Sequence, residues 1–206
     1  MVHGLIHMSQ PVILASGSAI RAQLLAQAGL SYEVITPRVD EEALRDAMLA
    51  EGATPRDLAD ALAEMKALRI SEKRPEALVI GCDQVLDLQG KVLSKPTSRD
   101  DARAQLAAMR GKRHSLLSAV VICEAGKPIW RHVGQVRLQV HDFSDQWLDG
   151  YLDRNWPDIA EAVGAYKLEK EGVRLFSRID GDYFTVLGLP LLDLLSYLGL
   201  RGDIET

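Results

Sequence analysis

The sequence of 206 residues contains only two cysteines, Cys82 and Cys123. Two cysteines are too few for a disulfide framework or a structural zinc site. Both lie in apolar runs, where a free thiol packs as a small hydrophobic side chain. The shortage of cysteine favours a reducing compartment, so we expect a cytoplasmic protein.

Long apolar runs and excess positive charge are also absent. No stretch reaches the roughly 20 apolar residues that span a bilayer, so we expect no membrane partner. Residues 1–10 lack a basic segment followed by an apolar core, so they do not resemble a signal peptide, and we expect a loose leader. The formal net charge is −5, which argues against a nucleic-acid partner but not against a small phosphorylated substrate.

Strand-like runs and helical periodicities alternate along the whole chain, without a linker or an internal repeat. We expect strands at 12–15, 31–36, 77–82, 85–88, 91–93, 115–124, 129–141, 173–180 and 183–186, and helices at 19–28, 41–49, 54–70, 98–109, 144–154 and 189–200. This pattern predicts an α/β fold with a mixed, twisted sheet flanked by helices. We expect residues 1–206 to form one domain of two lobes around a central cleft, since such a cleft commonly holds ligands.

One candidate anion site lies between the first predicted strand and helix, at Ser16-Gly17-Ser18 and Arg21. Backbone N–H groups at a helix N-terminus, together with hydroxyls and a guanidinium, can bind phosphate. The lysine of a Walker loop is missing. The alternative is an ordinary capped helix with a surface arginine, which uses the same residue types.

Acidic residues at two places could act in chemistry. Asp83 follows the buried run 77–82, and ligand sites of open α/β sheets lie at the carboxyl ends of strands. It could bind a metal or accept a proton from water, or it could simply occupy a turn. The cluster Asp40-Glu41-Glu42 could supply metal ligands, or it could complement the dipole of a helix N-terminus.

Basic candidates are less distinctive. Lys66 lies in a predicted helix, on or beside its apolar stripe, and Lys95 precedes Pro96 in a loop. Either could bind phosphate as a point charge, but taken alone each is typical of a surface lysine. His114 is isolated from other metal-binding residue types, so we expect a solvated or hydrogen-bonded ring.

Taken together and in order, the segments resemble the Maf family of nucleoside triphosphate pyrophosphatases over nearly the whole chain. The motifs that carry the resemblance are LASGSAIR at 14–21, VDE at 39–41, LAEMKA at 62–67, VIGCDQV at 79–85, SKP at 94–96, RGKRH at 110–114, GAYKLE at 164–169, GDY at 181–183 and VLGLP at 186–190. Each motif is modest, but their common order is highly specific.

The resemblance implies a two-lobed fold similar to that of inosine triphosphate pyrophosphatases, with the site in the cleft. It also implies Mg²⁺ or Mn²⁺, cleavage between the α- and β-phosphates of a nucleoside triphosphate, and compatibility with a homodimer. By motif, Asp83 would activate water or hold the metal, and Glu41 would be a metal-side carboxylate. The positions that would grip the triphosphate are Ser16, Ser18, Arg21, Lys66 and Lys95.

Four positions depart from the more usual family pattern. Ala19 and Ile20 replace the Pro and the first Arg of a Ser-x-Ser-Pro-Arg-Arg opening, which leaves Arg21 alone. Gln84 and Glu169 stand where members similar to thymidine and uridine triphosphate pyrophosphatases have Thr and Gln, so the chain looks more like the subgroup acting on 7-methylguanosine triphosphate.

A chemical reason supports that subgroup. Guanine presents two neighbouring donors on its Watson–Crick edge, and a carboxylate can accept from both, whereas a Gln amide offers one acceptor and one donor. We therefore hypothesise that Glu169 reads a guanine-like base. The alternative is that Glu169 is a surface acid in the charged stretch 167–171. For the protein as a whole, the alternative is a nucleotide-binding regulator of cell division with weak or no turnover.

Overall fold

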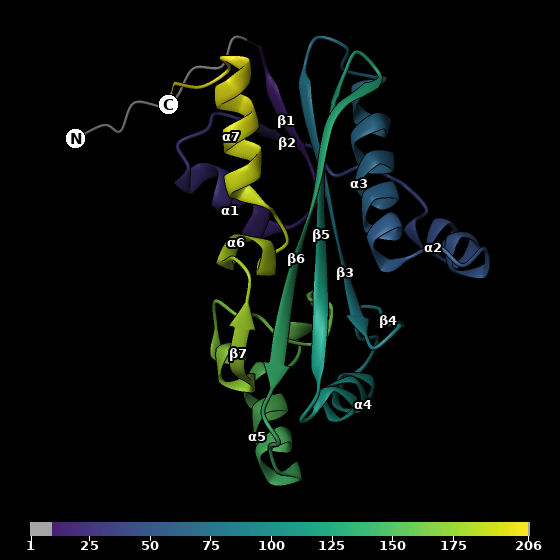
Figure 1. Ribbon diagram of the computed structural model, residues 1–206, viewed down its shortest axis with the longest axis vertical. Coiled ribbons are helices and arrows are strands. Elements are labelled where there is room, and N and C mark those ends of the chain that lie inside the picture. Colours follow the sequence, from purple (N-terminus) through teal and green to yellow (C-terminus); the bar gives the residue numbers. More distant parts are fainter. Residues whose placement is uncertain (1–9, 206) are drawn as a thin grey trace. The chain divides into compact units, whose positions relative to one another are not determined.

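The computed structural model describes residues 10–205 (Figure 1). The leader expected at residues 1–10 lies almost entirely outside this part of the chain. Among the described residues, no helix is long and apolar enough to cross a membrane.

The described residues contain one mixed sheet of seven strands, in the order β2-β1-β3-β5-β6-β7, with β4 paired to β3. Strand β1 is parallel to β2 and β3, whereas β4 is antiparallel to β3 and β7 is antiparallel to β6. The predicted α/β class with a mixed sheet is therefore confirmed. The strands are β1 (Val12–Ala15), β2 (Glu33–Val34), β3 (Leu78–Leu88), β4 (Lys91–Leu93), β5 (Arg113–Glu124), β6 (Lys127–Val140) and β7 (Phe176–Asp180).

The helices begin close to where their capping residues predict. Thr54 and Asp57 form a capping box at the start of α3, with Pro55 in the first helical position. Ser98 and Ser144 cap α4 and α5 through their hydroxyl groups. The helices are α1 (Ala19–Gln27), α2 (Glu41–Ala50), α3 (Pro55–Ser71), α4 (Arg99–Met109), α5 (Asp145–Asn155), α6 (Tyr183–Val186) and α7 (Leu191–Arg201), with 3₁₀ turns η1 (Asp158–Glu161) and η2 (Glu171–Leu175).

Three sequence predictions about strands were wrong. Of the expected strand 173–180, residues 173–175 lie in the 3₁₀ turn η2, and only 176–180 form a strand. The runs 77–82 and 85–88 belong to a single strand, β3, so Asp83 lies within a strand rather than beyond its end. Residues 183–186 form the short helix α6, because the side chain of Asp182 accepts a hydrogen bond from the N–H of Thr185 and caps a helical turn.

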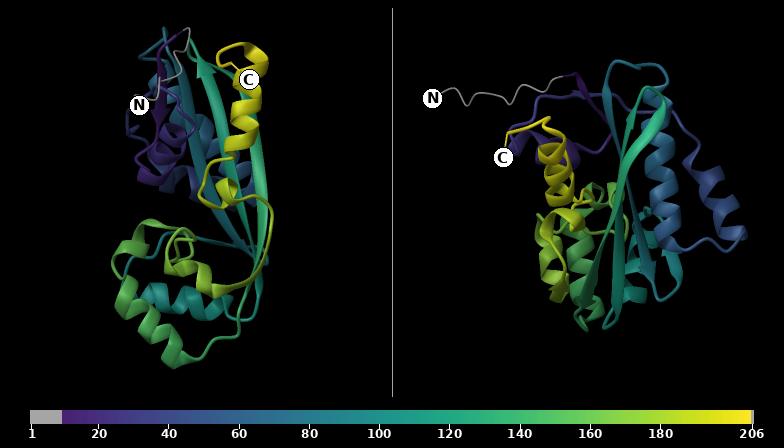
Figure 2. Two further views of the ribbon diagram at one scale, coloured as in Figure 1. Left: turned by 90° about the vertical axis from the view of Figure 1, so that its left-hand side faces the viewer. Right: turned by 45° about the horizontal axis from the view of Figure 1, so that its top comes forward.

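The chain divides into two compact units, and the long strands β3, β5 and β6 contribute to both. Unit 1 comprises residues 1–83, 118–134 and 188–206, and unit 2 comprises residues 84–117 and 135–187. In unit 1, helices α3 and α7 flank the sheet strands, and α2 packs on α3 (Figures 1 and 2). In unit 2, α4 packs beside α5.

Candidate functional site

Lys66 and Asp83 meet because helix α3 approaches strand β3 at a glycine. A Cβ atom on the buried Gly81 would lie 2.3 Å from the carbonyl oxygen of Ala63 and 2.7 Å from the backbone nitrogen of Ala67. A glycine inside a strand often marks such a close approach of two backbones. The approach places Lys66, which precedes Ala67 on α3, beside Asp83 on β3.

Two carboxylates share the ammonium group of Lys66. Its Nζ atom lies 2.6 Å from Oδ1 of Asp83 and 2.9 Å from Oε2 of Glu41. Lys66 is 8% exposed and Asp83 is 7% exposed, whereas the side chain of Glu41 is 42% exposed. One positive charge therefore faces two negative charges, and Glu41 is the member that solvent reaches most easily.

The environment of Asp83 makes its carboxylate a better proton acceptor. Burial raises the pKa of Asp83, and the charges of Lys66 and Arg21 offset part of this rise. A carboxylate whose pKa is raised toward neutrality accepts a proton from water more readily. Asp83 can thus either hold a cation or act as a general base.

Two acids of the cluster at 40–42 make different contacts. The side chain of Asp40 accepts a hydrogen bond from the N–H of Ala43 at 3.0 Å and caps α2, so the helix-terminus interpretation holds for Asp40. Glu41, the first residue of α2, instead pairs with Lys66. Glu42 is exposed. Of the three acids, Glu41 is therefore the one brought to Asp83.

Arg21 joins three segments of unit 1. Its Nη1 atom donates to the carbonyl oxygen of Cys82 at 3.0 Å and to Oγ of Ser16 at 3.3 Å, and its Nε atom donates to the carbonyl oxygen of Gly188 at 2.8 Å. Ser16 is buried. The half-exposed guanidinium is therefore held by backbone carbonyl groups and not free in solvent.

Ser18 occupies the N-cap position of α1 without capping the helix. Its side chain makes no capping hydrogen bond, and its own N–H donates to Oγ of Ser16 at 3.2 Å. The first N–H groups of a helix lack partners within the helix and favour negative charge. This terminus and the nearby Arg21 guanidinium are groups of the kind that bind phosphate, and the anion-site interpretation stays a prediction.

The donor set near Asp83 fits a magnesium-like ion better than an all-protein metal cage. Among residues 10–205, no group of three or more His, Cys, Asp or Glu side chains could hold a metal ion. Asp83 and Glu41 nevertheless bring two oxygen donors to one cation, the ammonium of Lys66. Mg²⁺ is commonly held by one or two carboxylates, with water and substrate phosphates completing its shell. The two carboxylates fit that pattern.

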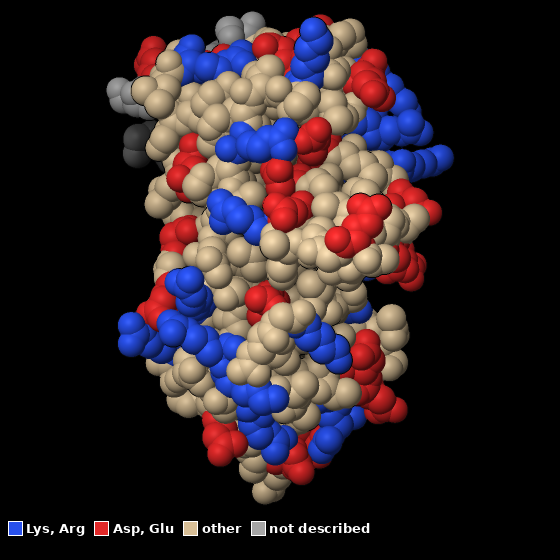
Figure 3. Space-filling model, turned by 45° about the vertical axis from the view of Figure 1, so that its right-hand side comes forward, with Lys and Arg blue, Asp and Glu red and all other residues tan. Residues whose placement is uncertain are grey.

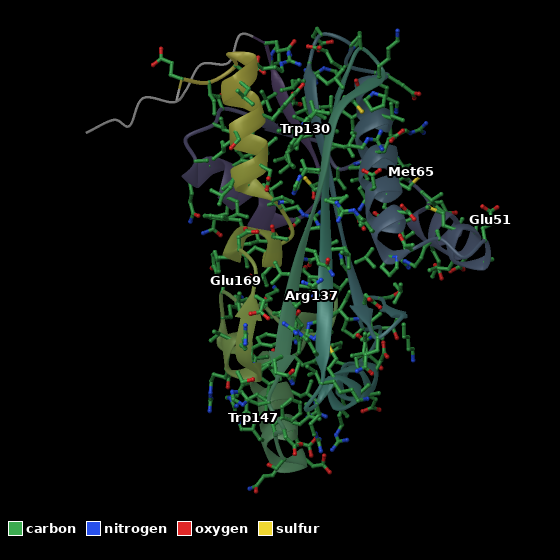
Figure 4. The ribbon with its side chains drawn as sticks, in the orientation of Figure 1. Glu51, Met65, Trp130, Arg137, Trp147 and Glu169 are labelled. Carbon is green, nitrogen blue, oxygen red and sulfur yellow. The ribbon has the colours of Figure 1, made fainter. Side chains whose placement is uncertain are left out.

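The two candidates in unit 2, Lys95 and Glu169, are both exposed. Lys95 and Lys91 line a cavity of about 340 Å³ between β4 and α4. Glu169 lies in the turn before η2 and is labelled in Figure 4. Neither side chain makes a hydrogen bond or ion pair with another described residue, so both remain available to a ligand.

The tertiary contacts of several residues near the site were not predicted from the sequence. Gly188 has a φ of +93°, and a Cβ atom there would lie 3.1 Å from Nη2 of Arg21, so glycine is needed for the arginine contact. The Gln84 amide donates to the carbonyl oxygens of Thr185 and Val186 at 3.2 and 2.9 Å. The glycine in the apolar run 77–82 was a usable signal, whereas the Gln84 contacts depend on tertiary structure.

His114 belongs to a buried aromatic cluster in unit 2. Its Nε2 atom lies 2.8 Å from the hydroxyl of Tyr166, and Phe176 packs against both rings. Burial lowers the pKa of His114 to about 4, which keeps the ring neutral at physiological pH. The prediction of a hydrogen-bonded histidine is confirmed.

One face of the molecule carries charged side chains of both signs. In Figure 3, basic side chains gather across the lower part of the view, with acidic side chains around them. Many of them form ion pairs, such as Arg131 with Asp60 and Glu64, and Arg103 with Asp149.

The chain is similar to known proteins over most of its length. A family model described as Maf-like protein matches residues 11–200. The chain therefore belongs to the Maf family, as its motifs predict.

Relatives named "Nucleoside triphosphate pyrophosphatase" match the chain over nearly its full length. The chain is 65% identical to the protein of Roseobacter denitrificans, over 96% of this chain and 99% of the relative. It is 63% identical to that of Ruegeria pomeroyi, over 97% and 100%, and 54% identical to that of Caulobacter vibrioides, over 94% and 97%.

A solved structure from Mycobacterium abscessus, titled "Nucleoside-triphosphatase / dITP/XTP pyrophosphatase", aligns at a TM-score of 0.36 and 14% identity, covering 65% of this chain and 74% of that chain. At that score, the expected likeness to inosine triphosphate pyrophosphatases stays a prediction.

Proposed function

We propose that the protein hydrolyses the α–β phosphoanhydride of a nucleoside triphosphate, with Mg²⁺ or Mn²⁺, to a nucleoside monophosphate and pyrophosphate. We further propose that it prefers a guanine-like base. The observation that carries the first proposal is the pair of carboxylates, Asp83 and Glu41, that share one buried ammonium group beside Arg21.

The enzyme class is that of the family relatives. Each of the three relatives compared is named a nucleoside triphosphate pyrophosphatase, and each aligns with more than nine-tenths of this chain. The protein is accordingly a hydrolase acting on an acid anhydride. Its metal and its preferred base are proposals.

The chemistry assigned to each residue follows from its charge and position. Asp83 takes a proton from the attacking water or contributes an oxygen to the metal, and Glu41 contributes a second oxygen. The metal, when bound, neutralises phosphate charge and orients the triphosphate. Ser16, Ser18 and Arg21 bind phosphate oxygens at the N-terminus of α1, where N–H groups and a guanidinium converge.

Lysines would contribute further positive charge. Lys66 lies next to the acidic pair, and Lys95 is exposed without an ion pair among the described residues. A triphosphate needs several cations, because charge on its oxygens must be stabilised in the transition state. We assign both lysines to phosphate binding.

Glu169 is our candidate for reading the base. It is exposed and makes no hydrogen bond or ion pair with another described residue, so both of its oxygens can accept from a ligand. A charged acceptor forms stronger hydrogen bonds than a neutral amide does. Guanine, with two donors side by side, would therefore be favoured over uracil or thymine.

The test compares the ratio of kcat/KM for guanine and uridine triphosphates in the wild type and in Glu169→Gln. We expect the substitution to lower this ratio about tenfold, because hydrogen bonds to charged groups are worth about 1.5–3 kcal/mol. Glu161→Gln, another exposed acid of unit 2, is the matched control and should leave the ratio unchanged. An unchanged ratio in Glu169→Gln would refute the base assignment while leaving the reaction intact.

A further inference from the structure

Lys66 contacts both of the carboxylates that are proposed to bind the metal. Its Nζ atom lies 2.6 Å from Asp83 and 2.9 Å from Glu41, so the two proposed metal-binding carboxylates are already neutralised in part. An ammonium group has three N–H donors; here one is hydrogen-bonded to Asp83, and Glu41 forms an ion pair with the same group. In this arrangement Lys66 is a partner of the carboxylates rather than a free phosphate-binding group.

The fold makes this arrangement specific. Gly81 lets the backbone of α3 approach β3, which fixes the distance between the Lys66 and Asp83 backbones. The apolar stem of Lys66 is buried, and Asp83 is buried beside it. A lysine carries a compact charge on a flexible stem, so its ammonium can turn toward another anion without movement of the helix.

We propose that Lys66 is an internal counterion that stands in for the metal in the free enzyme. In this proposal, which rests on the proposed function, Lys66 leaves the two carboxylates when metal and nucleotide bind together, and its ammonium then turns to the phosphates. The same lysine thus serves the carboxylates before binding and the substrate afterwards.

Charge balance explains why the exchange needs the nucleotide. A divalent cation added beside Lys66 would place three positive charges against two carboxylates, and Arg21 would add a fourth nearby. Like charges at such short range repel strongly where burial lowers the effective dielectric constant. A triphosphate supplies the missing negative charge and a new partner for Lys66. Metal should therefore bind weakly to the protein alone.

The test is Mn²⁺ binding to the nucleotide-free protein, measured from the electron paramagnetic resonance signal of the unbound ion. Lys66→Met should bind Mn²⁺ at least about tenfold more tightly than the wild type, because the substitution removes a positive charge that repels the ion at short range. Lys73→Met is the matched control, since Lys73 is exposed just beyond α3 and its loss changes net charge equally. It should bind Mn²⁺ as the wild type does.

A second variant keeps the test valid if Lys66→Met does not fold. Lys66→Gln removes the charge but keeps a hydrogen-bond donor for the carboxylates, and it should show the same gain in Mn²⁺ affinity. Affinity that is unchanged or weaker in the folded Lys66 variants, relative to Lys73→Met, would overturn the proposal.

The outcomes also separate this inference from the proposed function. If the wild type releases pyrophosphate but the Lys66 variants do not gain affinity, only the counterion proposal fails. If they gain affinity but the wild type releases no pyrophosphate, the carboxylates bind metal with Lys66 as competitor, and the proposed reaction fails instead.

Discussion

The candidate residues of the two units differ in how firmly the free protein holds them. In unit 1, Lys66, Asp83 and Arg21 are fixed by ion pairs and by hydrogen bonds to backbone carbonyl groups. In unit 2, Lys95 and Glu169 are exposed and make no such contacts among the described residues. The candidate side chains of unit 1 are therefore held in place in the free protein, whereas those of unit 2 are left for the ligand to order.

This difference is expected to appear in the kinetics. Groups that act on the reacting bond must be placed within a fraction of an ångström, so their loss lowers kcat. Exposed charged side chains are ordered at the moment of binding, which costs side-chain entropy and limits their contribution. Substitutions in unit 1 should therefore affect turnover, and those in unit 2 should affect KM or preference.

The largest effect is expected for Asp83→Asn. The amide keeps the shape of the side chain but cannot accept a proton from water, so kcat should fall about 10³-fold. Steady-state pyrophosphate release measures this, with thermal unfolding as the check on the fold. A fall of less than tenfold would remove Asp83 from the chemistry.

The next effect is the pH dependence of stability that the buried His114 of unit 2 should produce. His114 is 2% exposed and has a pKa of about 4, below its ordinary value near 6.5. The unfolded chain therefore binds a proton at higher pH than the folded chain does, so this contribution is present above pH 6.5 and is lost as pH falls toward 4. The free energy of unfolding should drop by about 3 kcal/mol over that interval from this group alone.

The measurement is denaturant unfolding at pH 7 and pH 4 for the wild type, His114→Gln and His141→Gln. His114→Gln should lose most of that pH-dependent difference, whereas His141→Gln, which changes an exposed histidine of the same unit, should retain it. Equal pH dependence in all three proteins would contradict the neutral, buried state of His114.

A moderate effect is expected for Arg21→Lys, which preserves the charge. Lysine lacks the planar fork that reaches the carbonyl groups of Cys82 and Gly188 together, so kcat/KM should fall about 30-fold. Arg56→Lys, at an exposed arginine of α3, should have no effect. Full activity in Arg21→Lys would show that charge alone suffices and that the fixed geometry is unnecessary.

The smallest effect is expected for Lys95→Met. Because the side chain is exposed and unpaired, we expect KM to rise about fivefold with little change in kcat. This pattern is typical of a contact that stabilises the bound substrate and the transition state equally. Lys91→Met removes a second lysine from the same cavity and should change KM less. A large loss of kcat in Lys95→Met would contradict the expectation that substitutions in unit 2 change KM or substrate preference and not turnover.

Much of the fold could be predicted from local chemistry, and the errors have physical causes. The helices expected from residues 54 and 98 and the strand expected at 91–93 were confirmed, because capping and turn residues lie next to them in the sequence. Strand β3 was divided in two because a charged residue, Asp83, interrupts its apolar pattern. Residues 183–186 were read as a strand because the cap supplied by Asp182 was overlooked.

The site was predictable as a set of residues but not as an arrangement. Family motifs pointed to Lys66, Glu41 and Asp83 separately, but no sequence pattern indicated that one ammonium would serve two carboxylates. The contacts of Arg21 with the carbonyl groups of Cys82 and Gly188 are equally invisible, because backbone acceptors carry no sequence signature. Such tertiary contacts can be read only from the folded chain.

The most direct test of the proposed reaction is a product analysis with purified protein, a guanine nucleoside triphosphate and Mg²⁺ or Mn²⁺. We predict equal amounts of pyrophosphate and nucleoside monophosphate, with neither product above background in Asp83→Asn. Orthophosphate with nucleoside diphosphate, or tight nucleotide binding without any product across the common nucleoside triphosphates, would contradict the proposed cleavage of the α–β bond.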